Sequence, residues 1–197
     1  MAKKIIAALA DSGLFLREWI ADPQRTGAVA PSSAQLAAAM AHWLPTDRES
    51  YVLELGPGTG AVTGALISRG LREDRLVAIE KNPTLARLLR ERYPSAHIIT
   101  GDAWHLDELL LDRSDPIDRV GAVISSLPLV NFPLAQAEQL AEKIRTVLEP
   151  HGTWVQYSYH IHKRRTRGTS RFQLLASKIV WFNLPPARVN VYRKYQR

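Results

Sequence analysis

The chain has 197 residues, no cysteine and a formal net charge of +7 at pH 7. This length suffices for one domain with a full hydrophobic core, and the lack of cysteine excludes disulfides and thiolate chemistry. The charge is uneven, because residues 151–197 carry ten Lys and Arg and no Asp or Glu. Such a basic region favours an anionic partner, either a nucleic acid or a membrane surface.

Residues 1–21 are predicted to form an amphipathic helix with isoleucine and leucine side chains along one face. The first residues resemble a secretion signal, but Asp11 interrupts the short apolar run and no small-residue cleavage site follows. Because the chain has no run of 18 apolar residues, no transmembrane helix is expected. We therefore expect a cytoplasmic protein.

Predicted strands and helices alternate from residue 31 onwards. Pro31, Ser32 and Ser33 are typical of a helix start. Helices are expected at 34–44, 62–69, 82–93 and 134–148, and strands at 51–55, 75–80, 96–100, 119–126 and 152–159, with a two-stranded hairpin at 178–194. This alternation predicts an α/β fold, a doubly wound parallel sheet with helices on both faces and an antiparallel edge.

The stretch VLELGPGTG ends the first predicted strand in an acid and three glycines. Doubly wound sheets bind ligands beyond the carboxyl ends of their strands, and Gly56, Gly58 and Gly60 let the backbone turn sharply and approach a ligand closely. Pro57 removes one N–H donor from the turn, and the charge of Glu54 would repel a phosphate. The loop therefore favours a ligand with a cationic amino group over a dinucleotide.

Polar residues follow the next three predicted strands. Glu80 ends the second strand, where a carboxylate can accept hydrogen bonds from ribose hydroxyls. Asp102 follows the third strand and can accept from an adenine amine, while Ser125 and Ser126 end the fourth, where a reacting group would lie. Adenine, ribose and a cationic amino-acid tail together describe S-adenosylmethionine.

The run ELGPGTG, Glu80 and the run GDA at 101–103 resemble the class I S-adenosylmethionine-dependent methyltransferases. The resemblance covers about residues 50–195 and implies a Rossmann-like sheet of seven strands, the last two forming the C-terminal antiparallel hairpin. It also implies S-adenosyl-L-methionine as cofactor and S-adenosyl-L-homocysteine as product. The expected cofactor-binding residues are Glu54, Gly56, Pro57, Gly58, Gly60, Glu80, Lys81, Asp102, Ala103 and Ser125.

Three further runs, FLREWIADPQRTGAVAPSS, SSLPLVNFP and WFNLPPARVNVYR, look like bacterial phospholipid N-methyltransferases. This family converts phosphatidylethanolamine to its methylated forms and phosphatidylcholine. The resemblance implies two parts: residues 1–30, an amphipathic helix and loop that cover the site, and residues 31–197, the methyltransferase domain. The chain departs from the family's Q-F-T-Y-G-like run, because it has QYSYH, and His160 in place of Gly bears on the choice of lipid acceptor.

A ribosomal RNA adenine dimethyltransferase is the alternative, since that family shares the glycine loop and often has N-L-P-Y after the fourth strand. There, polar groups hold the base amine while an aromatic ring stacks on the base. Here the run is S-L-P-L from Ser126 to Leu129, without the Asn or the Tyr. RNA is therefore the less favoured partner, and neither DNA, a metal nor an obligate protein partner is expected. An intact cofactor constellation argues against a non-enzymatic binding module.

The acceptor chemistry requires a proton to be removed. An ethanolamine nitrogen is normally protonated, with a pKa of about 10 like that of Lys, and a protonated amine cannot attack a methyl group. Desolvation beside a sulfonium cation would lower that pKa. Tyr159 is expected to position the amine, Ser125 and Ser126 to supply hydrogen-bond acceptors, and His160 to relay the proton.

Two segments are expected to contact the membrane. The N-terminal helix combines basic and large apolar side chains, as interfacial helices do. The loop after the fifth strand is basic and suits lipid phosphates. The residues concerned are Lys3, Lys4, Phe15 and Trp19 in the helix and Lys163, Arg164, Arg165 and Arg167 in the loop. We therefore expect a phospholipid substrate, an anionic membrane surface as partner, and a peripheral location at the inner leaflet of the cell membrane.

Overall fold

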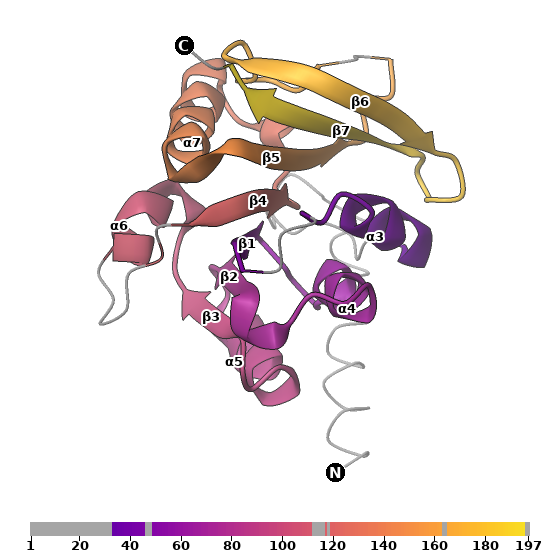
Figure 1. Ribbon diagram of the computed structural model, residues 1–197. Helices are drawn as coiled ribbons and strands as arrows, with labels where there is room; N and C mark the ends of the chain where they lie inside the picture. The colour runs from indigo at the N-terminus through magenta and orange to yellow at the C-terminus, as the bar shows by residue number, and fades with distance from the viewer. Residues whose placement is uncertain (1–32, 46–48, 112–116, 118, 163–164, 196–197) are drawn as a thin grey trace. The chain divides into compact units, whose positions relative to one another are not determined.

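A seven-stranded sheet in the order β3-β2-β1-β4-β5-β7-β6 forms the centre of the fold (Figure 1). The computed structural model describes residues 33–45, 49–111, 117, 119–162 and 165–195, all in the compact unit Ser32–Arg197. The strands are β1 Tyr51–Leu55, β2 Leu76–Glu80, β3 His97–Thr100, β4 Val120–Ser125, β5 Leu148–Ser158, β6 Phe172–Val180 and β7 Ala187–Lys194. β1 to β5 pair in parallel, while β7 is antiparallel to both β5 and β6. The predicted fold class is confirmed.

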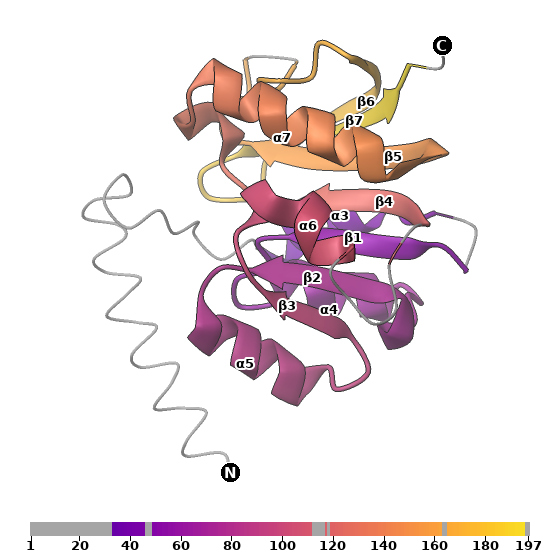
Figure 2. The same cartoon turned by 90° about the vertical axis from the view of Figure 1, so that its left-hand side faces the viewer.

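Helices cover both faces of the sheet (Figure 2). They are α3 Ala34–Ala41, α4 Ala61–Ser68 and α5 Pro83–Arg92 on one face, and α6 Leu106–Leu111 and α7 Leu134–Val147 on the other. Single 3-10 turns lie at Glu73–Arg75, Ala103–His105 and Leu129–Asn131. Successive strand residues alternate between the two layers: Val77 packs in the core beneath α6 and α7, and Ala78 packs against α5.

Local caps set the starts of two helices close to where the sequence predicts them. The Ser33 side chain accepts a hydrogen bond from the Leu36 N–H at 3.1 Å and caps α3. Asn82 accepts from two backbone N–H groups at the start of α5, and Pro83 occupies the first helical turn. These caps fix the helix starts through local chemistry, independent of the packing of the sheet.

Other element boundaries differ from the sequence-based expectation. β5 begins at Leu148 rather than at 152, because Pro150 and Gly152 interrupt the strand pattern in the sequence although pairing to β4 begins at Leu148. β6 begins at Phe172 rather than at 178, since this edge strand has partly exposed faces that dilute the apolar alternation. α3 ends at Ala41 instead of 44, and the short helix α6 was not predicted.

The carboxyl ends of β1, β4 and β5 are aligned at one edge of the sheet. Leu55 pairs in register with Ser125, and Ser125 pairs with Gln156. Ser158, at the end of β5, pairs with Arg188 near the start of the antiparallel strand β7. The β6–β7 turn therefore lies at the same edge as the loops that follow β1, β4 and β5. We call this the carboxyl edge.

Within the part of the chain that the structure describes, no helix has the length and apolar character needed to cross a bilayer. The expected helix over residues 1–21 lies outside the described residues, as does the expected cover formed by residues 1–30.

Candidate active site

The glycine loop between β1 and α4 turns through three residues with positive φ. The φ angles are 69° at Gly56, 59° at Gly58 and 81° at Gly60, which L side chains adopt only at a cost. A Cβ atom on Gly56 would lie 2.9 Å from Leu127 Cδ2, and one on Gly60 would lie 2.8 Å from Leu89 Cδ2. At Gly58, by contrast, a Cβ would meet no atom of the protein within 4 Å. The loop is thus packed at its ends and open at its centre.

Glu54 is fully buried beneath this loop. Its Oε2 accepts a hydrogen bond of 2.7 Å from the Thr63 hydroxyl, while its Oε1 has no hydrogen-bond partner among the described residues. Burial, helped by the charge of Glu80, raises the pKa of Glu54 from 4.5 to about 7, although the hydrogen bonds from Thr63 work in the opposite direction. A buried, half-satisfied carboxyl of this kind is stabilised as an anion by a cationic ligand.

Glu80 clamps the open centre of the loop. Its Oε2 accepts from the Gly58 N–H at 2.9 Å, and its Oε1 accepts from the Asn82 N–H at 2.8 Å. Each carboxylate oxygen has a second lone pair, so Glu80 can hold the loop and still accept from a ribose hydroxyl. This dual use was not evident from the sequence.

Asp102 caps the turn that follows β3. Its Oδ1 accepts from the Trp104 N–H at 3.2 Å, and its Oδ2 lies 2.8 Å from Lys81 Nζ. Partial burial acts to raise the pKa of Asp102, but the hydrogen bonds from Lys81 and Trp104 lower it overall. The expected cofactor residues Lys81 and Asp102 are therefore joined in an ion pair, next to the buried Ala103.

The segment after β4 is held by hydrogen bonds from both side chains and the backbone. Ser125 Oγ accepts from the Leu127 N–H at 3.4 Å, and the Ser126 N–H donates to the Leu55 carbonyl at 2.9 Å. From β5, Gln156 Nε2 donates to the Leu127 carbonyl at 2.9 Å. Gln156 was not predicted as a site residue, although a glutamine within an apolar strand is a signal for such a role.

Tyr159 lies beyond the end of β5, beside two residues absent from the expected site. Its ring is 5.4 Å from that of Tyr157, and its side chain interacts with Asn183 from the β6–β7 turn. Burial raises the pKa of Tyr159 and raises that of Tyr157 well above its usual value. Both phenols therefore stay protonated at neutral pH and act through hydrogen bonds. The neighbouring His160 is exposed, and its backbone N–H donates to Ser158 Oγ.

The expected membrane residues are only partly described. Lys3, Lys4, Phe15, Trp19, Lys163 and Arg164 lie outside the described residues. Arg165 and Arg167 are exposed but also bind backbone carbonyls: Arg165 donates to Thr169 and Phe172, and Arg167 donates to Phe132. These two arginines therefore tie the loop to the fold.

The residues at the carboxyl edge fit S-adenosylmethionine. Glu54 offers a buried oxygen that has no partner among the described residues, Gly58 faces open space, and Glu80 and Asp102 supply acceptors at the ends of β2 and β3. Glu54 would hold the cationic amino group, Glu80 the ribose and Asp102 the adenine.

Replacing Glu80 with Gln is expected to lower the free energy of unfolding by about 1 kcal/mol and to weaken cofactor binding severalfold. An amide has one carbonyl oxygen, so its NH2 group would face one of the two N–H donors from Gly58 and Asn82. Urea denaturation and calorimetry with the cofactor measure both effects. Glu91→Gln, at an exposed position on α5, is the matched control. Equal stability and equal cofactor affinity in the two variants would contradict the role of Glu80 in holding the loop.

Comparison with known proteins agrees with this geometry. Residues 52–152 match the family model described as "Methyltransferase domain". The chain is 32% identical over 149 residues to the ornithine lipid N-methyltransferase of Singulisphaera acidiphila, covering 74% of this chain and 77% of that protein. It is 32% identical over 148 residues to ribosomal RNA small subunit methyltransferase A of a Synechococcus species, covering 66% of this chain but 49% of that protein. The chain thus spans about half the length of the latter relative.

Solved structures share the fold. TrmN from Thermus thermophilus superposes with a TM-score of 0.63 at 18% identity, covering 81% of this chain and 48% of that one. The putative methyltransferase yhhF from Escherichia coli also gives 0.63, at 15% identity, and covers 87% of this chain and 91% of that one. The chain belongs to the methyltransferase domain family and is a class I S-adenosylmethionine-dependent methyltransferase.

Proposed function

We propose that this enzyme methylates the amino group of a membrane lipid. The observation that carries the proposal is the similarity to an ornithine lipid N-methyltransferase over 77% of that protein's length. Phosphatidylethanolamine is the acceptor that we expect from the resemblance of the three sequence runs, and ornithine lipid is the alternative within the same chemical class. Both would present an amine on a headgroup at the bilayer surface.

The segment after β4 supports a lipid amine over an RNA base. A stacking aromatic in the RNA enzymes would occupy the position of Leu129, which is 1% exposed here and packs in the core beneath α7. Ser126 replaces the asparagine that would hold the base amine. The site therefore lacks both parts of the platform expected for a flipped adenine.

The chain's own residues have two tasks in this reaction. S-adenosylmethionine supplies, when bound, an electrophilic methyl group on a sulfonium. The acceptor nitrogen must be deprotonated, so one proton leaves for each methyl that it gains. Tyr159, a neutral phenol at the end of β5, would orient the amine, and alignment of this kind supplies much of the rate. Exposed His160 would pass the released proton to water.

The test is mass analysis of products after incubation of the purified enzyme with S-adenosylmethionine. The acceptors are vesicles containing phosphatidylethanolamine, vesicles containing ornithine lipid, vesicles without an amine lipid, and ribosomal RNA. Methylated headgroups in one of the first two samples support the proposal and identify the acceptor. Methyl transfer to RNA alone would overturn it.

Replacing Tyr159 with Phe is expected to lower kcat by about 10- to 100-fold with little change in cofactor affinity, because only the group that orients the amine is lost. Tyr195→Phe is the matched control, since Tyr195 is 55% exposed and follows β7 at the opposite edge of the sheet. It should leave activity and the melting temperature unchanged. If Tyr195→Phe loses as much activity, the assignment to Tyr159 is wrong.

A further inference from the structure

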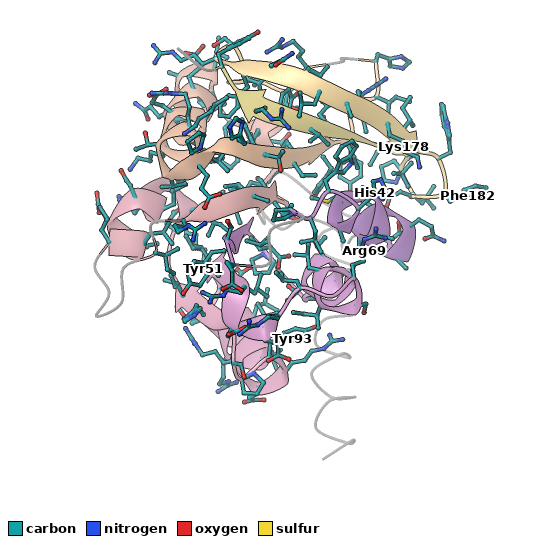
Figure 3. All side chains as sticks on the ribbon, viewed as in Figure 1. His42, Tyr51, Arg69, Tyr93, Lys178 and Phe182 are labelled. Atoms are coloured by element: carbon teal, nitrogen blue, oxygen red, sulfur yellow. The ribbon has the colours of Figure 1, made fainter. Side chains whose placement is uncertain are left out.

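Three large apolar side chains project into solvent at the turn between β6 and β7. Trp181 is 63% exposed, Phe182 is 87% exposed and Leu184 is 93% exposed. Single exposed apolar residues are common, but three within four consecutive positions form a patch of the kind that marks an interaction site. Figure 3 shows Phe182 at the outer end of the hairpin, pointing away from the fold. We call residues 181–184 the apolar tip.

Asn183, the polar residue of the tip, holds the turn in place. Asn183 is 4% exposed; its Oδ1 accepts from the Ser33 N–H at 3.2 Å, and its Nδ2 donates to the Pro185 carbonyl at 2.6 Å. The turn is thereby fixed to the start of α3, and the apolar neighbours of Asn183 are presented outward. An ordered apolar tip loses little conformational entropy when it binds.

The position of the tip and the charges around it indicate the kind of surface that it binds. The tip lies at the carboxyl edge, and its Asn183 side chain interacts with that of Tyr159. Residues 151–197 contain no acid, and the exposed Lys178 lies on β6 close to the tip (Figure 3). An apolar patch that includes tryptophan, in a region with only cationic charges, matches the interface of an anionic bilayer.

We propose that the apolar tip inserts into the lipid bilayer and turns the carboxyl edge of the sheet toward the headgroups. The inference deepens the proposed function, because it rests on a lipid acceptor and supplies the contact that brings a headgroup amine to Tyr159. It adds an anchor in the hairpin to the membrane segments expected from the sequence.

The first test compares vesicle binding by two double variants. Phe182→Ser/Leu184→Ser removes the two most exposed tip side chains. Leu111→Ser/Tyr195→Ser removes two exposed side chains, 68% and 55% exposed, at the ends of α6 and β7 and so at the opposite edge. The vesicles contain phosphatidylcholine and phosphatidylglycerol and no acceptor amine. Affinity should fall at least about tenfold in the tip variant and by less than about twofold in the control.

The second test locates the tip by tryptophan fluorescence. Lipids with brominated acyl chains quench indoles that enter the bilayer, so part of the quenching seen with the wild-type protein should disappear in Trp181→Phe. Unchanged quenching in that variant, or wild-type vesicle affinity in the tip variant, overturns the proposal. It is equally overturned if the tip variant changes only the oligomeric state, since the tip would then join two copies of the chain.

Activity assays separate this inference from the proposed function. A dispersed short-chain amine lipid should be methylated equally by wild type and tip variant, while vesicle-bound lipid should be methylated more slowly by the variant. Loss of activity on both acceptors would place the tip in the catalytic site and overturn the docking role. If the wild type methylates no lipid yet its tip still enters vesicles, the proposed function fails and the docking inference stands.

Discussion

Replacing Glu54 with Gln is expected to stabilise the cofactor-free protein at pH values above 7, by about 3 kcal/mol. The pKa of this carboxyl is 4.5 in the absence of burial and about 7 in the fold. Between these values the folded protein holds a proton that the unfolded chain has lost, so the free energy of unfolding falls as pH rises. The destabilisation that comes from ionising Glu54 in the fold is absent below about pH 4.5 and complete above about pH 7. The glutamine side chain of the variant is neutral at every pH and does not cause it.

Urea denaturation across this pH range measures the effect. The wild-type free energy of unfolding should decline between pH 4.5 and 7, and that of Glu54→Gln should decline less. Glu138→Gln, on the exposed surface of α7, is the matched control and should follow the wild-type profile. Parallel profiles for wild type and Glu54→Gln would show that folding does not raise the pKa of Glu54.

The same substitution is expected to weaken S-adenosylmethionine binding by at least about 30-fold, because one partner of a buried charge pair is lost. In the wild type, the cationic ligand favours the ionised carboxylate. Binding below pH 7 should therefore release a proton, and affinity should rise with pH until Glu54 is ionised in the free protein. Calorimetry in buffers of different ionisation enthalpy counts the proton, and Glu54→Gln should release fewer.

The placement of the expected cofactor residues could be predicted because topology determines it. In a parallel sheet, residues that end successive strands reach the same edge, so Glu54, Glu80 and Asp102 are brought to one edge whatever their separation in sequence. The glycine loop was predictable for a similar reason, since its positive φ angles require residues without a Cβ. Local chemistry also placed the starts of α3 and α5.

The acceptor side could not be predicted in the same way. Gln156 reaches the carbonyl of Leu127, and Asn183 reaches Tyr159 and Ser33, across separations that no local pattern encodes. From the sequence alone, the apolar tip is predicted only as an ordinary hairpin turn. Its exposure becomes evident only once β7 is paired with β5 and the turn is placed at the carboxyl edge.

Replacing Gly58 with Ala is expected to reduce cofactor affinity by at least about tenfold while lowering the free energy of unfolding by only about 1 kcal/mol. The protein itself has room for the added methyl group, because a Cβ at this position meets no described atom within 4 Å. The conformational strain comes from a φ of 59°. The space that the methyl group would fill is the space in which the cofactor approaches the backbone.

Gly70→Ala separates the loss of space from the backbone strain. Gly70 follows α4, has a φ of 97° and also has no atom within 4 Å of an added Cβ, but it lies at the far end of that helix from the glycine loop. Both variants should therefore lose stability to a similar degree in thermal unfolding, and only Gly58→Ala should lose cofactor affinity in calorimetry. Equal affinity in the two variants would mean that the cofactor does not lie against Gly58. The assignment of Glu54 and Glu80 to cofactor binding would then be wrong.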